Sequence, residues 1–225
     1  LKAGGQNRAL SYLNLGSYEA DRSYAKAARA TGAQLGSYAG YADGPSAEQW
    51  MNPGNPAWRK LVLEKIVPDL VKQGVDGFFL DNMEIVTHRE AGDGPVLSAA
   101  DRQAGLELVR EIRDRYPNLL IVLQNGTSDV TRTGTVAGGR SFASLLDGVS
   151  HEAVFTTDRN GTYRRETDAT ALREMRAWQA MGLRPGGRPL HMSISEYVNT
   201  LGNHGLAREV GRLGREAGFT TFVTD

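Results

Sequence analysis

Short apolar runs alternate with longer segments of helical periodicity along most of the chain. Continuous apolar runs bounded by turn residues are typical of strands that are buried on both faces of a sheet. These runs occupy residues 9–16, 34–41, 74–82, 118–126, 146–155, 189–197 and 218–225. The pattern predicts about seven strands that are separated by helices.

Helix boundary signals fall in the intervals between these runs. Asn55-Pro56 is a favourable N-cap and first-turn pair, and Ser98 with Asp101 is typical of another helix start. Three further helices, the first over residues 19–31, are expected to end at Gly32, Gly182 and Gly218.

Strands that alternate with helices predict a parallel sheet. About seven such units favour a (β/α)8 TIM-like barrel over an open doubly wound sheet. No G-x-G-x-x-G follows the first apolar run and no Walker A sequence occurs, so neither nucleotide-binding fold gains support. We find no linker or repeat, and we predict one catalytic domain over residues 1–225. The opening "LKAGGQNRAL" reads as the end of a helix that runs into a strand, so the first barrel strand is expected to be atypical or to lie upstream of Leu1.

Polar side chains mark the end of nearly every predicted strand. In parallel barrels the active site lies at the carboxyl ends of the strands. Those ends carry residues 14–19, Asp81 and Asn82, Gln124 and Asn125, His151 and Glu152, Glu196 and Tyr197, and Asp225. The pattern predicts a cleft that is lined by carboxylates.

Composition narrows the chemistry that this cleft can perform. The 225 residues include 26 Lys and Arg, 26 Asp and Glu, and no Cys, so the net charge is zero. This balance argues against a nucleic-acid partner, and the absence of Cys excludes disulfides and thiolate metal sites. The histidines lack metal-ligand spacing, so we expect neither a metal nor a cofactor. No apolar segment is long enough to span a membrane, and no signal peptide is visible, although a mature secreted chain has the same appearance.

Two converging carboxylates suit the cleavage of a glycosidic bond. One is ionised and attacks or activates water, while the other donates a proton to the leaving oxygen. Asp81 and Glu152 form the best pair because each lies at the end of an apolar strand, where partial burial and mutual repulsion separate pKa values. Asp76 begins the same strand as Asp81 and is expected to be structural.

Several neighbours have both a structural and a functional interpretation. Asn82 is equally suited to orienting a substrate hydroxyl and to satisfying loop backbone, and Gln124 is a better candidate ligand than Asn125, which begins an Asn-Gly turn. Glu19 and Arg22 are expected to form an ion pair at the rim. Glu196 is a candidate ligand because it ends a strand whose other positions are mostly apolar or small.

The order of five motifs resembles one enzyme family. The motifs are "YLNLGSYEADR" (12–22), "GVDGFFLDN" (74–82), "LQNG" (123–126), "HEAVF" (151–155) and "SISEY" (193–197). Together they are similar to glycoside hydrolase family 114, the endo-α-1,4-polygalactosaminidases and related bacterial exopolysaccharide hydrolases. The resemblance implies a TIM-like barrel and a retaining reaction in which Asp81 is the nucleophile and Glu152 the acid/base. Glu84 stands where the family often has Asp.

The resemblance implies a cationic polysaccharide rich in galactosamine as the substrate. Surplus carboxylate from Glu19, Glu84, Glu196 and Asp225 suits its ammonium groups. Flat faces for sugar rings are offered by Tyr12, Tyr18, Tyr38, Tyr41 and Tyr197.

Alternatives stay open at this point. The polymer is either fully deacetylated, partly acetylated or a galactosamine–glucosamine mixture, and the loop at 83–97 is expected to decide which. A non-catalytic saccharide-binding barrel is a further alternative, and a metal-dependent deacetylase is weaker. Because a polymer does not enter a cell, the resemblance implies a secreted or cell-surface protein. The oligomeric state is open.

Overall fold

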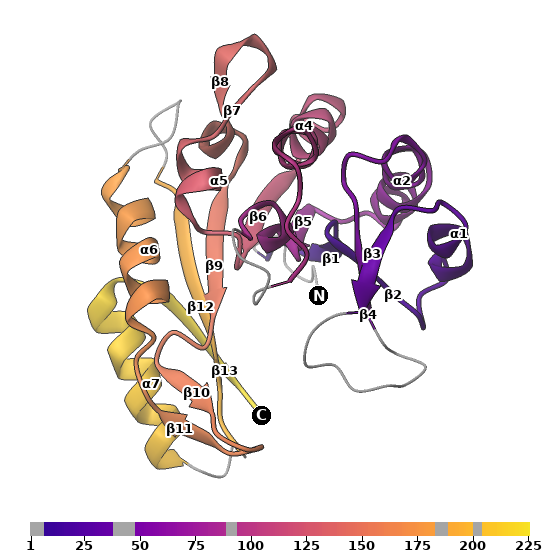
Figure 1. Cartoon of the computed structure of the whole chain (residues 1–225). Helices are drawn as coiled ribbons and strands as arrows, with labels where there is room; N and C mark the ends of the chain where they lie inside the picture. Colours follow the sequence, from indigo (N-terminus) through magenta and orange to yellow (C-terminus); the bar gives the residue numbers. More distant parts are fainter. Residues whose placement is uncertain (1–6, 38–47, 89–93, 183–188, 200–203) are drawn as a thin grey trace.

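Six parallel strands form the central sheet in a computed structural model that describes residues 7–37, 48–88, 94–182, 189–199 and 204–225. Their order in the sheet follows their order along the chain, so each strand pairs with the next one (Figure 1). The strands are β1 (Leu10–Asn14), β5 (Gly77–Asp81), β6 (Leu120–Gln124), β9 (Gly148–Glu152), β12 (His191–Tyr197) and β13 (Thr220–Thr224). This confirms the parallel pairing predicted for six of the seven apolar runs.

Helices follow the strands in alternation. The helices are α2 (Pro56–Leu61), the π-helix η1 (Val62–Ile66), α3 (Val67–Lys72), α4 (Ala99–Arg115), α5 (Asp129–Thr133), α6 (Ala169–Ala180) and α7 (His204–Ala217). Shorter elements after β5 and β6 are the 3-10 helices η2 (Met83–Val86), η3 (Ala137–Gly139) and η4 (Phe142–Leu145) and the strand pair β7 (Thr135–Val136) and β8 (Arg140–Ser141). None of the helices in the described ranges has both the length and the apolar character that a bilayer span needs.

The predicted caps are confirmed by their hydrogen bonds. The Asn55 side chain accepts from the N–H groups of Ala57 and Trp58, and the Ser98 hydroxyl accepts from the Asp101 N–H. Gly182 and Gly218 lie after α6 and α7 with φ values of 71° and 83°, which only glycine adopts readily.

One predicted strand belongs to a different sheet. The run at 34–41 forms β3 (Gln34–Ser37), which pairs antiparallel with β4 (Glu48–Met51), and β4 pairs in turn with β2 (Ser17–Glu19). The helix expected over 19–31 is accordingly shorter, α1 (Ala25–Arg29), because its first residues are used by β2 and the turn that follows. An apolar run does not specify the direction of its partner, so the pattern missed this excursion. Tyr38, Tyr41 and the opening residues 1–6 lie outside the described residues, as does 89–93 of the 83–97 loop.

A β-hairpin follows β9 along the chain. Strands β10 (Thr156–Asp158) and β11 (Tyr163–Arg165) are antiparallel, and the turn between them places Asn160 and Gly161 at φ values of 56° and 76°. Positive φ at both central residues is the geometry of a tight hairpin turn, for which Asn-Gly is the preferred pair. The sequence "DRNGTY" carried this signal, and the strand prediction missed it.

Two fully buried tryptophans fix the loops at the carboxyl end of the sheet. The Trp58 indole donates to the carbonyl of Leu15, directly after β1, at 3.1 Å. The Trp178 indole donates to the carbonyl of Thr127, shortly after β6, at 2.6 Å. Each anchor joins a helix to a strand end, so the backbone that carries the polar strand-end residues is held in place.

Candidate active site

The carboxyl ends of four strands bring Tyr12, Asp81, Glu152 and Tyr197 onto one face of the central sheet. Asn14 on β1 pairs with Asp81 on β5, and Glu152 on β9 pairs with Ser195 on β12. Successive side chains of a strand point to opposite faces, so residues two apart share a face. The register therefore joins the predicted carboxylates to aromatic side chains from the strands beside them.

A left-handed residue follows the polar group at the end of three adjacent strands. Asn82, Asn125 and Ala153 have φ values of 58°, 60° and 51°. They come directly after Asp81, Gln124 and Glu152, which end β5, β6 and β9. Positive φ is uncommon for residues other than glycine, and Asn tolerates it best. The chain thus turns sharply after each candidate side chain.

The Asp81 carboxylate is held by Tyr12. The Tyr12 hydroxyl donates to Asp81 Oδ2 at 2.8 Å and accepts from the Asn14 amide at 3.3 Å. Burial and the negative charge of Asp81 keep the pKa of the Tyr12 phenol far above its usual range, so the hydroxyl stays protonated and acts as a donor.

The electrostatic environment raises the pKa of Asp81. Burial is the largest cause, and the negative charges of Glu152 and Glu19 act in the same direction. Hydrogen bonds from the Tyr12 hydroxyl and the Asn82 N–H oppose this shift only in part. The negative charge of Glu152 is therefore one cause of the raised pKa of Asp81.

Glu48 joins this network from the antiparallel sheet. Its Oε2 accepts from the Ser17 hydroxyl at 3.1 Å and from the Asn82 amide at 3.0 Å, and the Asn82 amide also donates to the Ser17 hydroxyl at 2.8 Å. Burial, together with the charges of Glu19 and Asp81, raises the pKa of Glu48. Glu48 lies at the start of β4, a short strand that the hydrophobic pattern does not predict, so nothing in the sequence marked it as a site residue.

Gly16 allows the loops after β1 and β5 to meet. A Cβ atom at this position would lie 1.8 Å from the carbonyl oxygen of Asn82, so no larger residue fits without displacing the backbone. The close approach of Gly16 to the Asn82 backbone holds Asn82 in place, and Asn82 forms the turn directly after Asp81.

The Glu152 carboxylate is held on both oxygens. The Asn125 amide donates to Oε2 at 2.6 Å, and the Tyr197 hydroxyl donates to Oε1. The Asn125 side-chain oxygen also accepts the Glu152 N–H at 2.9 Å. The neighbouring His151 ring bonds the Glu152 carbonyl and not the carboxylate, as expected for adjacent residues on a strand.

Gln124 ends the strand β6, which lies between the strands that carry Asp81 and Glu152. Its side chain is 2% exposed, and in the described structure its Oε1 atom has no hydrogen-bond partner. Buried polar atoms nearly always have a partner, so this buried oxygen is one of few exceptions among the described residues.

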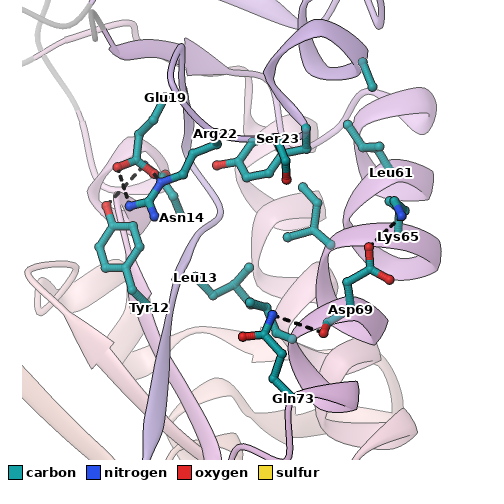
Figure 2. A pocket seen from close by; sticks show the side chains of 14 residues that line it. Tyr12, Leu13, Asn14, Glu19, Arg22, Ser23, Leu61, Lys65, Asp69 and Gln73 are labelled. Atoms are coloured by element: carbon teal, nitrogen blue, oxygen red, sulfur yellow. Dashed lines mark hydrogen bonds and ion pairs between the residues drawn. The ribbon is translucent and has the colours of Figure 1, made fainter.

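Glu19 and Arg22 form the predicted ion pair on the outer side of Tyr12. Two hydrogen bonds of 2.9 Å join the carboxylate to the guanidinium, whose carbon lies 5.4 Å from the centre of the Tyr12 ring. Figure 2 shows this pair at one end of a cavity of about 410 Å³, between β1, α1 and the α2–α3 helices. Tyr12 lines that cavity and also hydrogen-bonds Asp81.

Glu196 lies on the opposite face of β12 from Tyr197. It is 0% exposed, its Oε1 accepts from the Phe155 N–H at 2.9 Å, and its Oε2 accepts from the Thr156 hydroxyl at 2.8 Å. Burial raises the pKa of Glu196, and these hydrogen bonds counter the shift in part. This position differs from the expected contact with sugar, because adjacent strand residues point to opposite faces.

Two further predicted residues, Asp225 and Asp76, lie just after β13 and just before β5. Asp225 is exposed after β13, and three strands separate that strand from β5. Asp76 at the other end of β5 accepts from the Ala9 N–H at 2.8 Å, in agreement with a structural role. Within the described ranges, no three His, Asp or Glu side chains are grouped to hold a metal ion.

Two of the solved structures with a similar fold are those of the PelA glycoside hydrolase domain and of Ega3. The glycoside hydrolase domain of PelA from Pseudomonas aeruginosa is 21% identical with a TM-score of 0.68, over 97% of this chain and 78% of that one. Ega3 from Aspergillus fumigatus, solved in complex with galactosamine, is 18% identical with a TM-score of 0.68, over 100% of this chain and 77% of that one. No curated protein sequence matches the chain.

The family of this chain is shown by a match to a sequence-family model. The model of glycoside-hydrolase family GH114 matches residues 1–165, which contain β1 to β11 and both candidate carboxylates. The parallel sheet and the two structural likenesses agree with the barrel predicted from the strand–helix alternation. The chain therefore belongs to glycoside-hydrolase family GH114 and is a glycosidase with a TIM-barrel fold.

Proposed function

We propose that the protein cleaves α-1,4-linked galactosamine polymers internally, with Asp81 and Glu152 as its two catalytic carboxylates. The observation that carries this proposal is the pair itself, at the ends of β5 and β9, with each member held by a tyrosine hydroxyl. Such a pair is what glycosidic bond cleavage requires.

The two carboxylates are assigned different steps. Asp81 attacks the anomeric carbon while Glu152 donates its proton to the leaving oxygen, which gives a covalent glycosyl-enzyme. Glu152 then takes a proton from a water molecule. The resulting hydroxide attacks the anomeric carbon and displaces Asp81, so the reaction retains the anomeric configuration. Tyr12 and the Asn82 N–H hold the attacking carboxylate, and Asn125 and Tyr197 orient the acid/base.

Local charge supports an amino sugar as the substrate. The charge of Glu19 contributes to the raised pKa of Asp81, and the charges of Glu19 and Asp81 contribute to that of Glu48, although the chain as a whole has no net charge. A protonated amine relieves this repulsion, whereas a neutral sugar does not. The galactosamine bound to Ega3 points to the same chemical class. A polymer of this kind stays outside cells, so we place the protein in the extracellular space or at the cell surface.

The test counts new reducing ends after incubation with polygalactosamine. Asp81→Asn and Glu152→Gln are expected to lower kcat by about 10²–10⁴-fold or more. Asp76→Asn, in the same strand as Asp81 but at its other end, is the matched control and keeps most of the activity. No cleavage by the wild type, or undiminished cleavage by both variants, contradicts the proposal.

A second panel distinguishes the polymers. Fully deacetylated, partly acetylated and mixed galactosamine–glucosamine oligomers are compared by kcat/KM. Preference for the first supports the proposal, and preference for either of the others assigns the same chemistry to a different polymer.

A further inference from the structure

The hairpin after β9 places a second tyrosine against the Glu152 site. The ring of Tyr163, from β11, stacks on the ring of Tyr197, with centroids 5.4 Å apart and planes inclined by 23°. Tyr197 in turn donates its hydroxyl to Glu152 Oε1. The contacts form a continuous path from the hairpin through Tyr197 to the Glu152 carboxylate.

Side chains from β12 and the residues just after it anchor the hairpin, in part at Tyr163 itself. The Asn199 side chain accepts the Tyr163 N–H at 2.6 Å and donates to the Tyr163 carbonyl at 2.9 Å. The buried Glu196 carboxylate binds Phe155 and Thr156 at the base of β10. Residues 196 to 199 on β12 and just after it thus fix both ends of the hairpin that carries Tyr163.

We propose that Tyr163 is a positioning residue for Glu152 and that it acts by holding the ring of Tyr197. This inference rests on the proposed function, in which Glu152 is the acid/base. Tyr163 does not hydrogen-bond the carboxylate; its flat face restricts the Tyr197 ring to the orientation in which the hydroxyl meets Oε1. Glu196 is assigned to the anchor of the same hairpin and not to the substrate.

The structure makes a ring-specific prediction. Tyr163→Phe keeps the stacked face, so kcat and KM stay close to those of the wild type. Tyr163→Ala removes it, and kcat falls about 3- to 10-fold with little change in KM. Asn199→Ala removes the two hydrogen bonds to the Tyr163 backbone, so the Tyr163 ring is held less firmly and kcat is expected to fall as well. Arg164→Ala, on the exposed side of β11, is the matched control and leaves kcat unchanged.

A double-mutant cycle separates action through Tyr197 from direct contact with sugar. Tyr197→Phe removes the hydroxyl, so the further change Tyr163→Ala is expected to cost nothing more. Additive losses in the double variant contradict the proposal, as does a KM increase in Tyr163→Phe, because both indicate that Tyr163 touches the substrate.

A measurement without substrate keeps this inference distinct from the proposed function. Protein labelled with 3-fluorotyrosine gives a fluorine resonance for Tyr197, assigned by its loss in Tyr197→Phe. Tyr163→Ala is expected to shift and broaden this resonance, and Tyr163→Phe to leave it nearly in place. An unchanged resonance in folded Tyr163→Ala overturns the inference. If the wild type does not cleave polygalactosamine, the proposed function fails while the spectrum still tests the stack.

Discussion

Asn125 binds Glu152 at two points, through its side-chain oxygen on the Glu152 N–H at 2.9 Å and through its amide on the carboxylate at 2.6 Å. It does so from a left-handed backbone conformation, with φ of 60°. Asn125 thus forms a sharp turn after β6 and hydrogen-bonds both the backbone and the side chain of Glu152 on the neighbouring strand β9.

Replacing Asn125 by Gly separates the two roles. Glycine keeps the positive φ, so the variant loses only the side-chain hydrogen bonds. A hydrogen bond to a charged group contributes about 1.5–3 kcal/mol, so kcat is expected to fall roughly 10- to 150-fold. Steady-state kinetics with polygalactosamine measures this loss. Asn160→Gly, at the turn between β10 and β11, makes the same replacement at a similar φ and is expected to leave kcat unchanged. Full activity in Asn125→Gly contradicts the positioning of Glu152 by Asn125.

The raised pKa of Asp81 sets the acid limit of activity. If Asp81 attacks as an anion, kcat/KM falls at a pH above the ordinary aspartate value of about 3.9. Glu19→Gln removes a neighbouring negative charge and is expected to move this limit to lower pH. Glu216→Gln, in an exposed ion pair on α7, is the control with no displacement. A limit that moves upward or stays in place in Glu19→Gln shows that a different group governs it.

Asp81 also makes the folded state sensitive to pH. Its folded pKa is raised, so its contribution to stability is complete below the unfolded value of about 3.9 and is lost as the pH rises through the folded value. Asp81→Asn is therefore expected to have a higher Tm than the wild type at neutral pH, with the difference vanishing in acid. Thermal unfolding followed by circular dichroism from pH 3 to pH 8 measures it.

Asp69 provides a control of opposite sign. Its hydrogen bonds and ion pairs with Lys65 and Lys72 lower its pKa, so Asp69→Asn gives no stabilisation at neutral pH. Equal effects of both variants on Tm would show that burial of the Asp81 charge is not the cause.

Gly16→Ala tests the contact between the loops after β1 and β5. The added Cβ meets the Asn82 carbonyl at 1.8 Å, so the loops are forced apart and the free energy of unfolding falls by about 1–3 kcal/mol. Because Asn82 directly follows Asp81, kcat is expected to fall as well. Gly138→Ala, where no atom lies within 4 Å of the added carbon but φ is 77°, measures the cost of backbone strain alone. A Gly16→Ala variant with wild-type Tm and kcat would show that the loops yield freely.

Periodicity along the chain was sufficient for the central sheet and for part of the site. The apolar runs around Leu80, Leu123 and Val149 are continuous because both faces of a parallel sheet are covered, and this predicted strands and their neighbours. Asp81 and Glu152 were predicted because each ends such a run, where a barrel opens to its active site. The ion pair of Glu19 with Arg22 followed from spacing on a single turn.

Tertiary structure decided which polar groups meet. Glu48 reaches Asn82 across 34 residues of sequence through the antiparallel sheet, and nothing local marks it as a neighbour of Asp81. Asn125 and Tyr163 act on Glu152 through contacts between separate elements. The sequence by itself determined at which strand ends the carboxylates lie, because the local pattern of apolar residues marks the buried strands. Only the folded chain decided their partners and that Glu196 faces away from Tyr197, because hydrogen bonds depend on register and side-chain direction across strands.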